Sequence, residues 1–149
     1  FFSGTFAGET LSLAATKATL EFMEDNNVIE HLKAMGEKLK SGLNDIINDM
    51  QAGQWLSVSG HAVWSFLNIS DHGNYSTIEL KSLFLQEMAQ RGFLIGGGHN
   101  LNYSHKANDI EALLHAYKEV LQLLADTVSN EDFSSRFKGE LLEPVFKVR

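Results

Sequence analysis

Apolar residues recur at steps of three and four along the first fifty positions, which predicts two consecutive helices. The first helix spans about Thr10 to Asp25. Its expected inner face is rich in small and apolar residues, namely Leu11, Ala14, Ala15, Ala18 and Phe22, and Met23 could extend it. Asn26-Asn27 interrupts this pattern, and a long amphipathic helix then runs from Val28 to about Met50.

From Trp55 the apolar period changes to two, which is typical of strands. Residues 56–58 and 63–69 are expected to pair as a hairpin around Gly60-His61-Ala62. Ser76 and Glu79 have the spacing of a capping box, so a third helix should begin there, reach about Gln90 and end at Gly92.

Shorter elements are expected in the last third of the chain. Residues 93–95 predict a third strand, which Gly96-Gly97-Gly98 interrupts, and residues 101–103 return to an extended pattern. A fourth helix follows Asn108-Asp109, a helical turn lies near residues 133–137, and residues 144–148 could form an edge strand. The expected fold class is α+β, with a small antiparallel sheet of three to four strands, helices packed on one face and a long N-terminal helix pair.

Composition and charge narrow the possible functions. The 149 residues are 44% hydrophobic and 21% charged, which suits a single globular domain. A net charge of −7 without a basic cluster argues against a nucleic-acid partner, and no apolar run is long enough to predict a membrane span. The absence of cysteine fits a cytoplasmic protein. Because the sequence opens on Phe1-Phe2 rather than Met, we expect a fragment of a longer protein.

The residues just before the first helix form a candidate anion site. Gly4 and Gly8 permit tight turns in which backbone N–H groups approach a ligand, and Thr5 adds a hydroxyl donor. The same residues also suit an ordinary loop and helix cap, and spacing alone favours that simpler interpretation.

Other catalytic arrangements have weaker support. His99 and His105 could form a metal pair, but the neighbouring sequence offers no third ligand. Ser59, His61 and Asp71 could be drawn as a hydrolase triad, although no Gly-x-Ser-x-Gly motif occurs in the chain. We therefore expect neither a resident metal nor a catalytic residue among these side chains.

The segment Ser3–Ala15 resembles the loop and helix that follow the catalytic lysine in class III aminotransferases, which are pyridoxal-phosphate (PLP) enzymes of fold type I. The glutamate-1-semialdehyde aminomutase group is the most similar, because Gly4-Thr5 and Gly8 match its Gly-Thr-x-x-Gly pattern. Residues 91–95, Ser104-His105 and Asp109-Ile110 resemble the family's C-terminal strand, small-residue-His step and last helix. The resemblance spans nearly the whole chain.

The resemblance implies a PLP-dependent aminotransferase or aminomutase that acts on a small amino or carbonyl compound. Thr5, with Gly4 and neighbouring amides, would bind the PLP phosphate of the partner subunit in a homodimer. Residues 1–25 would be the phosphate loop and linking helix, and residues 26–149 the small C-terminal domain. The Schiff-base lysine and the acid that pairs with the pyridine nitrogen would precede Phe1, so the chain alone should be inactive. The alternative is a non-catalytic dimerisation or interaction module.

Two departures from the family pattern generate further expectations. Glu9-Thr10 stands where the family commonly has Asn-Pro, which predicts a weaker helix cap and places a negative charge near the phosphate. Lys106 stands where a capping Thr is usual, so Asn108 is expected to cap the last helix.

Overall fold

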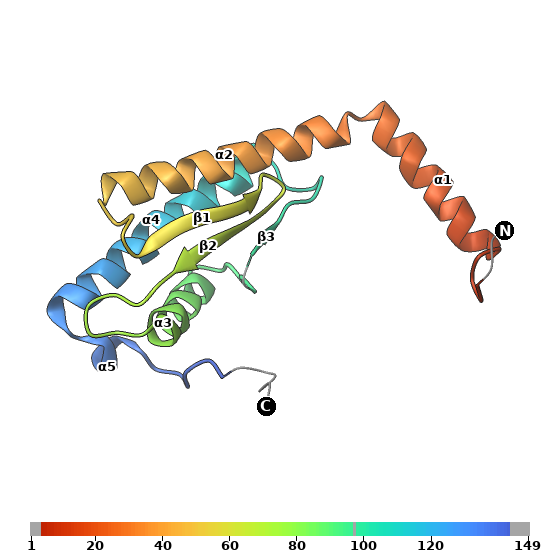
Figure 1. Ribbon diagram of the computed structural model, residues 1–149. Helices are drawn as coiled ribbons and strands as arrows, with labels where there is room; N and C mark the ends of the chain where they lie inside the picture. The colour runs from red at the N-terminus through yellow and green to blue at the C-terminus, as the bar shows by residue number, and fades with distance from the viewer. Residues whose placement is uncertain (1–3, 97, 144–149) are drawn as a thin grey trace.

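The computed structural model describes residues 4–96 and 98–143 and has the expected α+β architecture. A pair of N-terminal helices precedes a β-hairpin, and three further helices and one short strand complete the fold (Figure 1). In chain order the elements are α1 (Thr10–Asp25), α2 (Val28–Asp49), β1 (Leu56–His61), β2 (Trp64–Ile69), α3 (Thr77–Gln90), β3 (His99–Asn100), α4 (Ala107–Asn130) and α5 (Phe133–Arg136).

The sheet is antiparallel, with strand order β1-β2-β3. The predicted hairpin is confirmed, and its register runs from Leu56 opposite Ile69 to His61 opposite Trp64. Strand β3 pairs with the beginning of β2, where Asn100 lies opposite Trp64. The sheet therefore has a full hairpin and a very short third strand.

The prediction of a strand at residues 93–95 is wrong, because these residues lie in a loop. The end of α3 explains the difference. Gly92 adopts a left-handed conformation with φ of 83°, and the Phe93 N–H donates to the Met88 carbonyl at 2.9 Å. This αL turn closes the helix and takes up the first amide of the segment, so pairing with the sheet begins only at His99.

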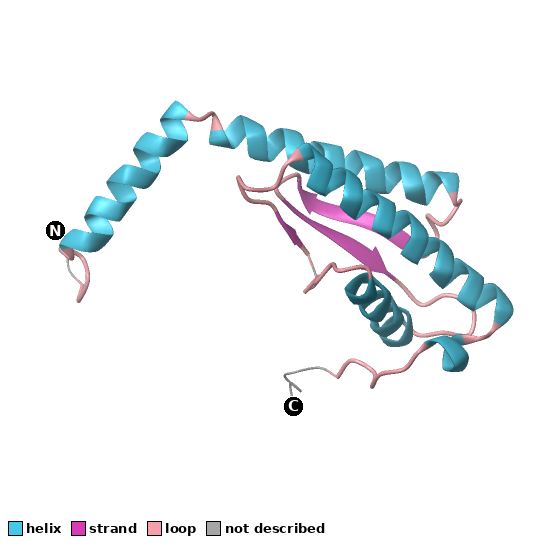
Figure 2. Cartoon of the chain, turned by 180° about the vertical axis from the view of Figure 1, so that it is seen from behind, coloured by secondary structure: helices cyan, strands magenta, loops and turns pink. Residues whose placement is uncertain are grey.

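Helix α4 packs between α2 and α3, and α2 also contacts both strands of the hairpin. Viewed from behind, α2 and α4 lie across one face of the sheet, as predicted (Figure 2). We call α2, α3 and α4 the helical layer. The side chains between this layer and the sheet form one core that is almost free of solvent. Its fully buried apolar members include Leu39, Leu43, Leu80, Leu83, Met88, Tyr117, Val120, Leu121 and Leu124.

Helix α2 approaches the hairpin most closely at Gly36. A Cβ atom at this position would lie 2.2 Å from the carbonyl oxygen of Ala62, in the turn between β1 and β2. That distance is far inside van der Waals contact, so only glycine allows the helix to lie so near the strands.

A buried series of hydrogen-bonded side chains connects the sheet to α4. The hydroxyl of Ser65 lies 2.9 Å from Nδ1 of His99, and Nε2 of His99 lies 2.5 Å from the hydroxyl of Tyr117. All three side chains are buried, so each satisfies its polar atoms through the next. Burial lowers the pKa of His99 and raises the pKa of Tyr117, which keeps both side chains neutral near pH 7.

The sequence predicted how two of the helices begin, and one of these two predictions is confirmed. The Ser76 and Glu79 capping box is confirmed, with the Ser76 N–H donating to the Glu79 carboxylate at 2.8 Å. The prediction that Asn108 caps the last helix is wrong, since α4 already begins at Ala107. Lys106 is the N-cap, and its N–H donates to the Asp109 carboxylate at 2.8 Å.

The two predictions for the tail have different outcomes. The helical turn near residues 133–137 is confirmed as α5. The edge strand predicted for residues 144–148 lies outside the described residues.

Helix α1 has the predicted bounds but not the predicted inner face. None of its residues is buried, and Leu11 and Phe22 are 76% and 50% exposed. The helix extends away from the other helices and the sheet, and among these described elements it is met at its C-terminal end alone (Figure 1). Within residues 4–96 and 98–143, every helix falls short of the length or the apolar character required to cross a membrane.

Replacing Gly36 by Ala should lower the free energy of unfolding. Helix propensity alone would favour Ala by about 1 kcal/mol, but forcing a methyl group against the hairpin backbone costs about 1–3 kcal/mol beyond that gain. Urea denaturation measures the change. Gly53→Ala is the matched control, because a Cβ there meets no atom within 4 Å. Greater stability for Gly36→Ala would contradict the close approach.

His99 should make the fold sensitive to acid. Its pKa in the folded protein lies below its ordinary value of 6.5, so below about pH 6.5 the unfolded chain takes up a proton that the folded chain does not. Stability is therefore complete above that pH and declines as the pH falls toward the folded-state pKa. Urea denaturation between pH 8 and 5 should show a smaller loss for His99→Gln than for the wild type. An equal loss in both would exclude His99 as the cause.

Candidate functional site

Gly4 and Thr5, the two predicted cofactor contacts, lie together in the loop that precedes α1. The loop is folded by two turns, in which the Ala7 N–H donates to the Gly4 carbonyl and the Glu9 N–H donates to the Phe6 carbonyl, both at 3.2 Å. The Thr5 side chain is exposed, and the Thr5 hydroxyl and the amides of Thr5 and Phe6 have no acceptor among the described residues. As far as the described residues go, these groups remain available to donate to a ligand.

Glu9 caps the helix that follows. Its carboxylate accepts the N–H of Leu11 at 2.9 Å and the N–H of Ser12 at 2.6 Å. Hydrogen bonds from Ser12 and then Leu11 lower the pKa of Glu9, so the side chain carries its negative charge at neutral pH. The expectation of a weak cap is therefore wrong, because the longer glutamate side chain reaches the same amides that an N-cap Asn would satisfy.

This cap changes where an anion could bind. Two amides of the first turn of α1 already donate to Glu9, so the helix terminus itself is occupied by a carboxylate. The remaining donors are those of the loop, where Thr5 offers a hydroxyl and Gly8 leaves open space on the side that a Cβ would fill. One hydroxyl with adjacent free amides is a donor set that fits a phosphate group.

The loop lies at the far end of α1, away from the sheet and the helical layer (Figure 1). Phe6 in this loop is 78% exposed. The donors of Thr5 therefore face no other part of the described chain, and a ligand held there needs further contacts from another molecule or segment.

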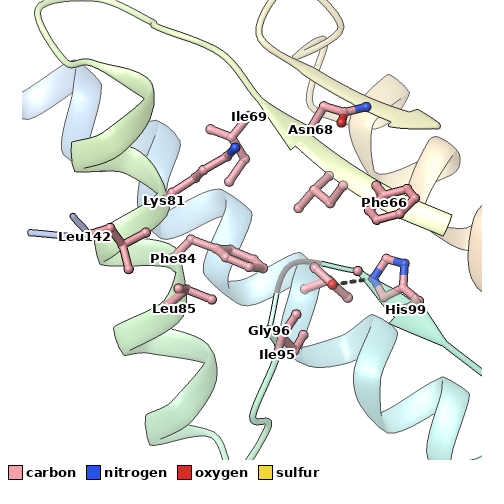
Figure 3. A pocket seen from close by; sticks show the side chains of 13 residues that line it. Phe66, Asn68, Ile69, Lys81, Phe84, Leu85, Ile95, Gly96, His99 and Leu142 are labelled. Carbon is pink, nitrogen blue, oxygen red and sulfur yellow. Dashed lines mark hydrogen bonds between the residues drawn. The ribbon is translucent and has the colours of Figure 1, made fainter. Parts of the chain in front are cut away.

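A second feature is a pocket of about 410 Å³ between β2, α3 and the loop before β3. Its walls are mainly apolar, with Lys81 and Asn68 as polar members (Figure 3). The labelled apolar side chains are Phe66 and Ile69 of β2, Phe84 and Leu85 of α3, Ile95 of the loop and Leu142 of the segment after α5. The pocket and the loop at residues 4–9 are built from different elements and do not form one site.

His99 and Tyr117 also line this pocket, but they are unsuited to proton transfer there. Both ring nitrogens of His99 are hydrogen-bonded within the protein, to Ser65 and to Tyr117. Neither nitrogen is free to accept a proton from a ligand. Their arrangement indicates a structural role.

The same contacts argue against the proposed His99 and His105 metal pair. His105 uses Nδ1 to accept the Asn102 N–H at 3.2 Å, while both nitrogens of His99 have protein partners. Within the part of the chain that the structure describes, no group of three or more histidine or carboxylate side chains could hold a metal ion. The geometry of the described residues therefore gives no support to a metal site at His99 and His105.

The possible hydrolase triad of Ser59, His61 and Asp71 is not assembled either. The Ser59 hydroxyl accepts a hydrogen bond from Asn68 at 2.9 Å, and His61 contacts the nearby Val63 N–H at 3.5 Å. The Asp71 carboxylate instead accepts the N–H and hydroxyl of Thr77. Each side chain therefore has a separate local role.

One cluster of aromatic side chains is not indicated by any pattern in the sequence. Tyr103 lies where α1, α2 and the loop before α4 meet, and its ring contacts Phe22 and His31. Tyr103 is more than seventy positions from either residue in the chain, so no periodicity or motif could indicate that it lies against them.

Comparisons with known proteins were made for both sequence and structure. No protein-family model matches the sequence. The chain is 27% identical over 156 residues to a glutamate-1-semialdehyde 2,1-aminomutase from Natronomonas pharaonis, covering 81% of this chain and 35% of that protein. It is 28% identical over 85 residues to an acetylornithine aminotransferase from Synechocystis sp., covering 57% of this chain and 20% of that protein. The chain thus spans about a third of the length of the curated aminomutases it matches.

The structure also has a solved relative. The FumI protein of Sphingopyxis sp. MTA144, in its PLP internal aldimine form, matches with a TM-score of 0.68 over 91% of this chain and 31% of that one, at 21% identity. This likeness shows that the two share a fold. In sequence the chain is thus similar to glutamate-1-semialdehyde aminomutases and to an acetylornithine aminotransferase, and in fold it is similar to part of a PLP-containing protein.

Proposed function

We propose that this chain is part of a PLP-dependent aminotransferase or aminomutase, in which Thr5 and Gly4 bind the cofactor phosphate of the partner subunit. The similarity to these proteins supports the reaction class and the cofactor. In the proposed homodimer each subunit completes the other's active site. The substrate is a small amino or carbonyl compound, and the protein acts in the cytoplasm.

The observation that carries this proposal is the position of the phosphate loop. It lies at the tip of a helix in which no residue is buried, and its free donors meet no acceptor in the described chain. A loop displayed in this way can contribute only to a site that another subunit or segment completes. This position suits a phosphate contact made across a dimer.

The residues of the chain would bind and orient the cofactor rather than react with it. The Thr5 hydroxyl and the loop amides would donate hydrogen bonds to phosphate oxygens, while Glu9 keeps the first turn of α1 closed. PLP, when bound, supplies the electron sink that amino-group transfer requires. The phosphate contact would fix the ring's position relative to a lysine and an acid supplied by other parts of the enzyme.

Lys17 is the lysine nearest the loop in the sequence, and its environment is that of a surface residue. Its Nζ atom lies 3.7 Å from the Glu21 carboxylate, and both side chains are exposed on α1. We therefore propose that residues 1–25 are the phosphate loop and linking helix, residues 26–149 form the small C-terminal domain, and this chain alone is not catalytic.

A non-catalytic dimerisation module is the second candidate. The exposed apolar residues of α1, including Leu11, Leu13 and Leu20, would favour self-association without any cofactor. The two functions differ in whether Thr5 contributes to PLP binding, which the following prediction tests.

Thr5→Val should weaken retention of PLP by the full-length holoenzyme. Valine keeps the shape of threonine but removes the hydroxyl donor to a charged phosphate, a loss of about 1–3 kcal/mol. The expected increase in the dissociation constant is therefore roughly 5- to 150-fold by equilibrium dialysis.

Thr19→Val is the matched control for this prediction. Thr19 lies on the same helix arm, where its hydroxyl donates to the Ala15 carbonyl at 2.8 Å, and its replacement should leave PLP affinity unchanged. Equal affinity of wild type and Thr5→Val would count against the phosphate assignment and favour the dimerisation module.

The chain alone should form no specific covalent bond with the cofactor. After incubation with PLP and borohydride, mass spectrometry should find only scattered, substoichiometric pyridoxyl adducts, because the described lysines are surface residues without an enclosed cofactor site. A stoichiometric adduct at one lysine, for example Lys81 beside the pocket, would show that the chain carries its own reactive lysine.

A further inference from the structure

Helix α1 and the loop of residues 4–9 at its tip form an arm. The direction of this arm is set at the joint between α1 and α2. Asn27 adopts a left-handed conformation, with φ of 47° and ψ of 42°, which breaks the helical path between Asp25 and Val28. The Asn26 side chain donates to the Phe22 carbonyl at 2.8 Å and so closes the end of α1. The two helices consequently meet at an angle, with α1 directed away from the layer (Figure 1).

Tyr103 touches both sides of this joint. Its ring meets Phe22 of α1 edge to face, with 5.6 Å between centroids, and meets His31 of α2 at 5.0 Å. Its hydroxyl also points to the Asn26 carbonyl at 3.4 Å. One side chain from the loop before α4 thereby bridges the last turn of α1 and the first turn of α2.

The loop that carries Tyr103 is itself firmly held. Nε2 of His31 donates to the His105 carbonyl at 2.8 Å, which ties the loop to α2. The Lys106 ammonium lies 4.6 Å from the centre of the Tyr103 ring and donates to the Tyr103 carbonyl at 3.0 Å. Since Lys106 is also the N-cap of α4, the ring is fixed to the helical layer.

We propose that Tyr103 is a positioning residue, which fixes the angle of α1 and thereby the place of Thr5. A small change of the angle at the joint causes a large displacement of Thr5, because α1 is long. Helix α1 has 16 residues and is about 24 Å long, so a swing of about 10° at the joint moves the loop by about 4 Å. That displacement exceeds the tolerance of a hydrogen bond to a phosphate oxygen.

The effect on cofactor binding rests on the proposed function, whereas the effect on the angle of α1 does not. The two parts therefore need separate measurements. The first measures the position of α1 relative to α4, and the second measures PLP retention.

The chain contains no cysteine, so two introduced cysteines can carry spin labels at defined sites. Ala14→Cys on α1 and Lys118→Cys on α4 are both exposed positions. Pulsed electron spin resonance, with the labelled chain diluted in unlabelled chain, then measures the distance between arm and layer within one molecule. The starting protein should show one narrow distance distribution.

Tyr103→Leu should broaden or shift that distribution by about 3 Å, because Ala14 lies about 18 Å from the joint and a swing of about 10° displaces it by that amount. Tyr103→Phe keeps the ring contacts and should retain the narrow distribution. Tyr75→Leu is the matched control, because Tyr75 is also a half-buried tyrosine packed on an aromatic ring, Phe133, but lies away from the joint. Circular dichroism confirms that each variant remains folded. An unchanged distribution in folded Tyr103→Leu would overturn the proposal.

In the full-length holoenzyme, Tyr103→Leu should also weaken PLP retention, and Tyr103→Phe should restore it. If the arm loosens and Thr5→Val weakens PLP binding while Tyr103→Leu does not, the positioning role is refuted. If the arm loosens but Thr5→Val has no effect, the proposed function fails and the control of the α1 angle by Tyr103 stands.

Discussion

Helix α1 does not bury its apolar side chains against the part of the chain that the structure describes. Leu11, Leu13, Leu20 and Phe22 are each at least half exposed, although burying one such side chain contributes about 1.5–3 kcal/mol. The helix follows from local pattern and capping, but its apolar surface requires another surface to cover it. Under the proposed function the loop at its tip is subject to the same constraint, because the Thr5 hydroxyl and the amides of Thr5 and Phe6 have no acceptor among the described residues. A contact completed by another subunit satisfies both requirements together.

Glu9 refines the chemistry of that contact. A helix that begins beside a glycine-rich loop would ordinarily offer its first amides to an anion. Here two of those amides donate to the Glu9 carboxylate, so the loop and not the helix terminus supplies the available donors. The phosphate would then depend more on the Thr5 hydroxyl than a Gly-Thr motif alone suggests. The joint at Asn27 and the ring of Tyr103 become important for the same reason, since they determine where that hydroxyl lies.

Local chemistry was predictable from the sequence, and non-local contacts were not. The capping box of Ser76 and Glu79 and the left-handed Gly92 depend on residues a few positions apart, so their effects follow from spacing. Strand β3 has only two residues and therefore no period to detect, which is why residues 93–95 were mistaken for the third strand. The site followed the same division. Gly4 and Thr5 are proposed as site residues from a local motif. The cap by Glu9 depends on side-chain reach, and the contacts of Tyr103 and the Ser65–His99–Tyr117 hydrogen bonds depend on the fold.

The central claim is that Thr5 contacts a cofactor phosphate across a subunit interface. The most direct measurement is a crystal structure of the full-length protein with PLP bound. Our account predicts that the Thr5 hydroxyl lies about 2.5–3.0 Å from a phosphate oxygen of the PLP held by the partner subunit. A Thr5 hydroxyl beyond hydrogen-bond reach of any phosphate, or one bonded to the phosphate of its own subunit, would contradict the account.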